Sequence, residues 1–255
     1  MNFRNKTIRL TAISLFLLGI GGCSVWNNFT TYFNLYYNTA TLYEDAELEI
    51  LSQKRDLFAT EPLVIPGNAK TSLVKVVEKS SKILQFNSTS SYVDEALMML
   101  GKSFYYQGNY QKSKRKFEEL LATAIDDDEI ITEASLWIAK NAFELRDFTE
   151  ALRVIKEVRV KAVEEGYENI IKDSYVQEIK YRIKEEDYPD AITLANEFAD
   201  VYDDGVVRAQ IYFELGKLYT LMGENDNAIL AYEKVFDNEP DFDLEIIATI
   251  KYAVA

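Results

Sequence analysis

The chain has 255 residues, of which 48% are hydrophobic; only 10 are glycine and 4 proline, so turns are few and long helices are favoured. The formal net charge of −14 argues against a nucleic-acid partner, because nucleic-acid binders usually carry a basic surface. The lack of histidine and the single cysteine remove the commonest general base and most metal ligands, so we predict no enzyme, no catalytic residue and no metal site.

The first 22 residues predict a signal peptide. Three basic residues and no acid lie within residues 1–9, and the uncharged stretch 10–18 is too short to span a membrane. Residues 20–23, Ile-Gly-Gly-Cys, resemble the bacterial lipobox. That resemblance implies removal of residues 1–22 and attachment of diacylglycerol and an acyl chain to Cys23, with no other cofactor. The alternative is an ordinary signal peptide with an unrelated cysteine nearby.

Residues 23–60 are predicted to form a lipid-anchored aromatic segment and a first helix over 38–59. Six aromatic rings follow the cysteine closely: Trp26, Phe29, Tyr32, Phe33, Tyr36 and Tyr37. Such rings are favoured at a membrane surface, but they could equally pack on the first repeat. Either interpretation keeps the body of the protein close to the membrane.

Residues 61–93 are predicted to be a divergent first repeat. Two prolines and Gly67 interrupt the chain after the first helix, and residues 69–86 have the apolar periodicity of an amphipathic helix.

Residues 94–255 repeat an internal pattern, over about 94–127, 132–165, 172–205 and 209–242, followed by a partial copy. Leu-Gly-Lys recurs around Gly101 and Gly216, with a second glycine seven residues later and an aromatic residue sixteen later. We expect small residues where two helices touch and aromatic rings in the layer between repeats. The predicted packing positions are Gly101, Phe104, Ser113, Phe117, Ala139, Ala151, Ala191, Gly216, Tyr219, Ala228 and Tyr232. Ile179 replaces the glycine in the third copy, which predicts looser packing there.

This spacing resembles the tetratricopeptide repeat (TPR). The resemblance implies an all-α, right-handed solenoid of stacked antiparallel helix pairs. The lipobox followed by such repeats resembles the outer-membrane assembly lipoproteins of the BamD type. Residues 27–47, with the pairs Phe33-Asn34 and Tyr37-Asn38, resemble TPR lipoproteins of gliding motility and type IX secretion.

In such solenoids the first helix of each pair lines a concave groove. The position after the Leu-Gly pair holds a lysine in every copy, and aromatic residues lie nearby. The predicted groove residues are Lys102, Tyr105, Tyr106, Lys140, Phe143, Lys180, Phe213 and Lys217. They could bind an acidic or extended peptide, but the lysines could instead pair with groove acids such as Glu95, Glu133 and Asp173, or be solvated.

These features predict a lipid-anchored scaffold of the bacterial outer membrane that faces the periplasm. Its expected partners are envelope proteins, either outer-membrane or secretion components. The alternative is a peptide- or glycan-binding adaptor for cell-wall enzymes. Because a solenoid end normally carries a polar cap and this sequence ends in Ala-Val-Ala, we expect either further residues or a partner at that end.

Overall fold

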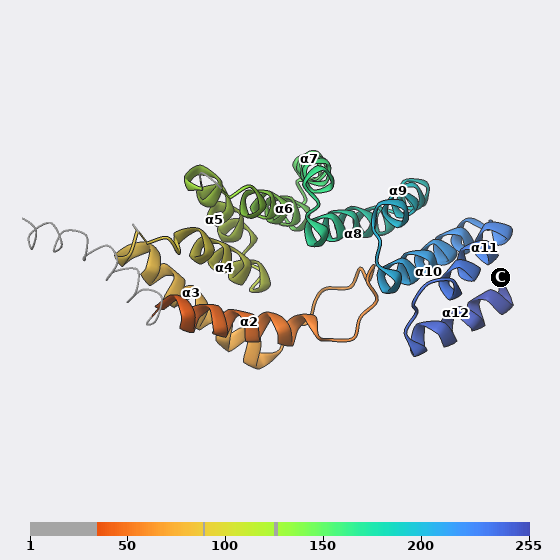
Figure 1. The fold of residues 1–255 in the computed structure, drawn as a ribbon, viewed down its shortest axis with the longest axis horizontal. Helices are drawn as coiled ribbons and strands as arrows, with labels where there is room; N and C mark the ends of the chain where they lie inside the picture. The colour runs from red at the N-terminus through yellow and green to blue at the C-terminus, as the bar shows by residue number, and fades with distance from the viewer. Residues whose placement is uncertain (1–34, 89, 125–126) are drawn as a thin grey trace, which may run out of the picture. The chain divides into compact units, whose positions relative to one another are not determined.

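The computed structural model describes residues 35–88, 90–124 and 127–255, and every regular element within these ranges is helical (Figure 1). The chain divides into two compact units. The first contains the described residues up to Ser52 and from Ile65 to 124, and the second contains Gln53–Val64 and the residues from 127 onward. The segment Gln53–Val64 therefore belongs to a different unit from the chain on either side of it.

The described part of the first unit has four helices, each packed on the next along the chain. They are α2 (Tyr37–Leu51), α3 (Gly67–Phe86), α4 (Val93–Tyr106) and α5 (Tyr110–Thr123). Apolar side chains at helical spacing fill the interior, including the fully buried Leu73, Leu97 and Phe117.

The helix predicted over 38–59 ends eight residues early, at Leu51. Phe58, which the periodicity placed inside that helix, is instead only 3% exposed and belongs to the hydrophobic cluster of the second unit. Burying such a ring stabilises by roughly 1.5–3 kcal/mol, whereas helix propensities of ordinary residues differ by less than about 1 kcal/mol. Tertiary packing therefore outweighs the local preference.

The second unit contains seven helices. They are α6 (Asp128–Glu144), α7 (Phe148–Glu165), α8 (Glu168–Lys184), α9 (Tyr188–Val201), α10 (Gly205–Met222), α11 (Asn225–Phe236) and α12 (Phe242–Val254). Aspartate carboxylates cap four of them by accepting a hydrogen bond from the backbone N–H three residues on: Asp127, Asp147, Asp204 and Asp241. The helices stack as successive pairs, which confirms the predicted all-α solenoid.

Where the two helices of a pair come closest, a small residue on one helix lies opposite a large residue on the other. We call this relation the rule of reciprocal size. A Cβ atom on Gly216 would lie 2.3 Å from the ring of Tyr232, and one on Gly101 would lie 2.6 Å from the ring of Phe117. These two rings therefore fill the contact within their own helix pair.

The third copy reverses the sizes. The large residue is Ile179, and the position sixteen residues later holds Ala195 instead of an aromatic residue. Both side chains are fully buried in the same hydrophobic cluster. Ile179 is thus fully enclosed, and the small residue at the position sixteen later offers the space that its side chain needs.

The turn inside each helix pair contains one residue in the left-handed backbone region. Glycine occupies this position in the outer copies, with φ of 73° at both Gly108 and Gly223. The inner copies have Arg146 with φ of 61° and Glu186 with φ of 59°. A side chain with a Cβ atom is strained in this region, whereas glycine is not.

We predict that Arg146→Gly raises the free energy of unfolding by about 0.5–1 kcal/mol, because Arg146 is exposed and its left-handed conformation costs glycine little. Urea unfolding followed by circular dichroism measures the change. Arg146→Ala is the matched control, since it removes every side-chain atom beyond the Cβ atom and keeps the Cβ atom itself. Equal stability of the two variants would contradict the explanation.

The last helix, α12, exposes much of its apolar surface. Phe242, Ile250 and Val254 are 75%, 58% and 76% exposed, and Ala248 is the buried residue of this helix.

Candidate functional site

A loop without helical structure lies against the helices of the second unit. We call this segment, Gln53–Val64, the strap; it is the orange loop that reaches the start of α10 in Figure 1. Its anchor is Phe58, which joins the hydrophobic cluster that also contains Leu136 of α6, Ile179 of α8 and Phe213 of α10. Leu57 packs against the same cluster. The helices of this unit thus bind a polypeptide segment in the structure.

The strap holds its own shape through local hydrogen bonds. The Gln53 side-chain amide donates to the carbonyl of Val64 at 2.9 Å, which closes the base of the loop. The Arg55 guanidinium donates to the carbonyls of Ala59 and Glu61. The Phe58 N–H donates to the Asp56 carboxylate at 2.9 Å, so the two side chains used for docking are fixed relative to each other.

Ion pairs attach the strap to α10 and α12. Asp56 Oδ2 lies 3.0 Å from Lys217 Nζ, and Lys54 pairs with Asp243. Lys217 also pairs with Glu214, one turn earlier in α10. Burial lowers the pKa of Lys217, but the neighbouring Glu214 and Asp56 carboxylates outweigh that effect and raise it above its usual value. Lys217 is therefore held positively charged between two acids.

The predicted groove lysines of the second unit have different surroundings. Lys140 is buried, lies 3.2 Å from the Asp173 carboxylate and sits 3.8 Å above the Trp137 ring. Burial lowers the pKa of Lys180, and the positive charges of Arg55 and Lys140 lower it further. The pairing of Lys140 with Asp173 is one that the sequence suggested.

The aromatic groove positions of this unit are part of the packing. Phe213 is only 8% exposed, and its ring centroid lies 5.9 Å from that of Tyr232. Phe143 is partly buried, 5.1 Å from the ring of Tyr181. Phe213 therefore belongs to the hydrophobic interior that receives Phe58, and is not an open surface ring as the sequence suggested.

The remaining predicted groove residues lie in the first unit. Lys102 Nζ is 5.9 Å from the centre of the Tyr43 ring of α2, and the Tyr106 hydroxyl donates to Glu47 of the same helix at 3.0 Å. Tyr105 packs edge-on against Tyr106. The row of lysines predicted from the sequence is thus divided between two units, and in the first unit it contacts α2.

The lipidation site and most of the aromatic segment lie outside the described residues. This applies to Cys23, Trp26, Phe29, Tyr32 and Phe33. Of the two described rings, Tyr36 stacks on Tyr92 of the first unit with centroids 4.3 Å apart, and Tyr37 is 54% exposed. One ring of the segment therefore packs on the helices, as the second of the two interpretations expects.

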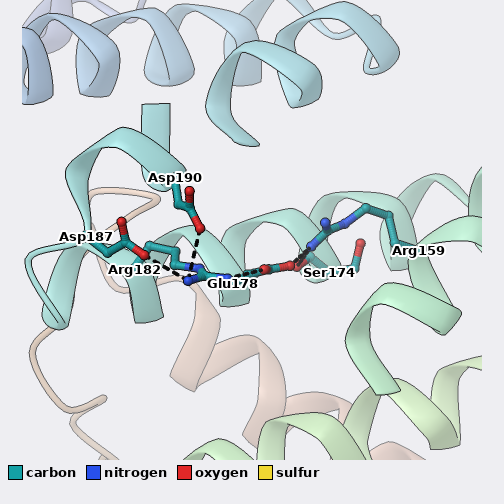
Figure 2. Close-up of polar contacts among 6 residues, drawn as sticks. All are labelled: Arg159, Ser174, Glu178, Arg182, Asp187 and Asp190. Atoms are coloured by element: carbon teal, nitrogen blue, oxygen red, sulfur yellow. Dashed lines mark hydrogen bonds and ion pairs between the residues drawn. The ribbon is translucent and has the colours of Figure 1, made fainter. Parts of the chain in front are cut away.

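A buried network of charges links α7, α8 and α9 (Figure 2). The Glu178 carboxylate, 1% exposed, accepts from Arg159 at 2.7 Å and from Arg182 at 3.3 Å. Arg182 also pairs with Asp187 at 2.8 Å and Asp190 at 3.1 Å. Arg159 additionally donates to the carbonyl of Ser174 and lies over the ring of Tyr175.

One position of the repeat pattern carries a signal for this network in the sequence. Glu178 occupies the position immediately before the glycine site, where the other copies have Leu100, Ile138 and Leu215. A charge at an apolar position of a repeat requires a buried partner. A pocket of about 660 Å³ opens beside the network, but both of its arginines already pair with carboxylates, so it offers no surplus charge to an anion.

Comparison with known proteins agrees with this geometry. Two sections of the chain, residues 98–163 and 209–242, match the tetratricopeptide repeat. The chain contains TPR repeats. Among solved structures, it is similar to YrrB, described as a TPR protein with an unusual peptide-binding site. The identity is 17%, the TM-score is 0.47, and the match covers 81% of this chain and 98% of that one. No curated protein matches the sequence significantly.

Two further observations concern the described residues alone. No group of three or more potential ligand side chains among them is arranged to hold a metal ion. None of the described helices combines the length and the apolar character needed to cross a bilayer.

Proposed function

We propose that this protein is a lipid-anchored scaffold of the bacterial outer membrane, whose TPR repeats face the periplasm and hold segments of other envelope proteins. The observation that carries the proposal is the strap: the helices of the second unit bind this non-helical loop of twelve residues through a buried aromatic ring and charged side chains. TPR repeats serve protein–protein interaction, and the lipobox ending at Cys23 supports the membrane anchor.

Two machines fit the resemblances seen in the sequence. Lipobox and repeats together favour β-barrel assembly, while residues 27–47 favour a gliding or secretion apparatus. The second is the more particular resemblance, because it concerns a specific stretch and not only a general layout. A peptide- or glycan-binding adaptor for cell-wall enzymes is the competing function.

Photocrosslinking in living cells tests the scaffold. A photoreactive amino acid replaces Lys180 or Lys217 beside the strap, and the exposed Lys156 of α7 serves as the control position. We expect adducts with an outer-membrane or secretion protein from the first two positions and not from Lys156. Adducts with cell-wall enzymes alone, or from Lys156 alone, would contradict the proposal.

Fractionation tests the anchor separately. We expect the wild-type protein to incorporate labelled palmitate and to sediment with outer membranes. The Cys23→Ser variant should incorporate none and leave the outer-membrane fraction. Unchanged sedimentation of that variant would refute the lipid anchor without affecting the crosslinking result.

A further inference from the structure

The strap has the properties of a bound ligand. It belongs to the second unit although its flanking helices belong to the first, and it is attached through Lys54, Asp56, Leu57 and Phe58. Phe58 is almost fully buried, and Asp56 supplies a charge contact with Lys217 that is partly open to solvent. A buried aromatic side chain and a complementary charge contact are features by which a protein surface recognises a short peptide segment.

We propose that the strap is an internal ligand that occupies the binding site of the second unit until a partner displaces it. The partner segment is a peptide with an acid two residues before a phenylalanine, as in Asp56-Leu57-Phe58, which forms a turn at these residues as the strap does. This inference rests on the proposed scaffold function and specifies both its ligand and its regulation. The free site is available only in the fraction of molecules whose strap is released, so the strap lowers the apparent affinity.

A binding titration tests this with the full chain in detergent. The probe is a fluorescent peptide with the sequence of residues 53–64, and the protein is either wild type or Phe58→Ser, which removes the anchor of the strap. Fluorescence anisotropy should show binding to the Phe58→Ser protein that is at least tenfold tighter than to the wild type. The same peptide carrying Phe58→Ser is the matched control and should not bind.

The charge contacts are tested in the same assay. A peptide carrying Asp56→Lys should bind the Phe58→Ser protein at least tenfold more weakly than the native peptide, because its new positive charge repels Lys217. Lys217→Glu in the protein should weaken the native peptide about tenfold, since Glu214 and the new carboxylate then both repel Asp56. Equal affinities across these variants would overturn the assigned ligand chemistry.

A second variant covers the case in which Phe58→Ser does not fold. Asp56→Lys changes a side chain that is 41% exposed, keeps Phe58, and repels Lys217. It should bind the peptide at least threefold more tightly than the wild type. If every strap variant with a wild-type circular dichroism spectrum binds no better than the wild type, the strap is a fixed part of the fold and the inference is wrong.

The crosslinking experiment separates this inference from the proposed function. Envelope-protein adducts that increase in the Phe58→Ser strain support both. Adducts that are equally strong in wild type and variant support the scaffold and refute the internal ligand. Peptide binding in vitro with no adduct in either strain supports the ligand chemistry and refutes the scaffold.

Discussion

Replacing Glu178 with alanine is expected to lower the free energy of unfolding by about 3–5 kcal/mol. The change removes the carboxylate that Arg159 and Arg182 share in the network of Figure 2. Removing one partner of a buried ion pair leaves uncompensated charge in the interior, and this desolvation penalty dominates the loss. Arg159 is most affected, because it is buried and Glu178 is its carboxylate partner.

Urea unfolding of the wild type and of Glu178→Ala measures this loss. The exposed pair Arg153–Glu157 is the matched control, since its atoms are 2.9 Å apart but both side chains are more than half exposed. Glu157→Ala should change stability by less than about 1 kcal/mol. A loss at Glu178 no larger than that at Glu157 would show that the network is solvated in solution.

Replacing Gly216 with isoleucine is expected to destabilise the fold by about 3 kcal/mol, because a Cβ atom there would lie 2.3 Å from the Tyr232 ring. Tyr232→Ala alone should cost about 3–5 kcal/mol by leaving a cavity, since Tyr232 is 1% exposed. The double variant reproduces the arrangement that Ile179 and Ala195 have in the third copy. We therefore expect it to be less destabilised than the sum of the two single changes by about 2 kcal/mol.

A double-mutant cycle in urea measures that coupling. The control is Gly67→Ala at the start of α3, where an added Cβ atom would meet no other atom within 4 Å, so little destabilisation is expected. Additive losses at Gly216 and Tyr232 would show that the two sites do not compensate for each other. The rule of reciprocal size would then not explain how the third copy tolerates Ile179.

The repeats were predictable because their determinants recur at a fixed spacing and act within one helix pair. Gly101 and Gly216 indicate a close helix contact from the sequence alone, since the aromatic ring sixteen residues later is in the same copy. The end of α2 was not predictable in this way. Phe58 leaves the helical pattern because of a cluster formed by residues far along the chain, and local periodicity contains no information about them.

The candidate site was likewise predictable only in part from the sequence. The positions of Lys140, Lys180 and Lys217 follow from the repeat pattern. The sequence also suggested Asp173 as one of several acids with which these lysines could pair. The pairing of Lys217 with Asp56 spans 161 residues and depends on how the strap is folded. Phe213 has a groove position in the pattern but is buried in the structure, in the cluster that Phe58 of the strap also joins.

The strap also has a consequence for the order of folding. Solenoid repeats contact only their neighbours, so their helices form rapidly from local interactions. The contact between Asp56 and Lys217 instead closes a loop of 161 residues, which would cost roughly 4–5 kcal/mol of chain entropy before the intervening helices form. We therefore expect the strap to dock only after the helices of the second unit have formed and have brought Lys217 within reach of Asp56.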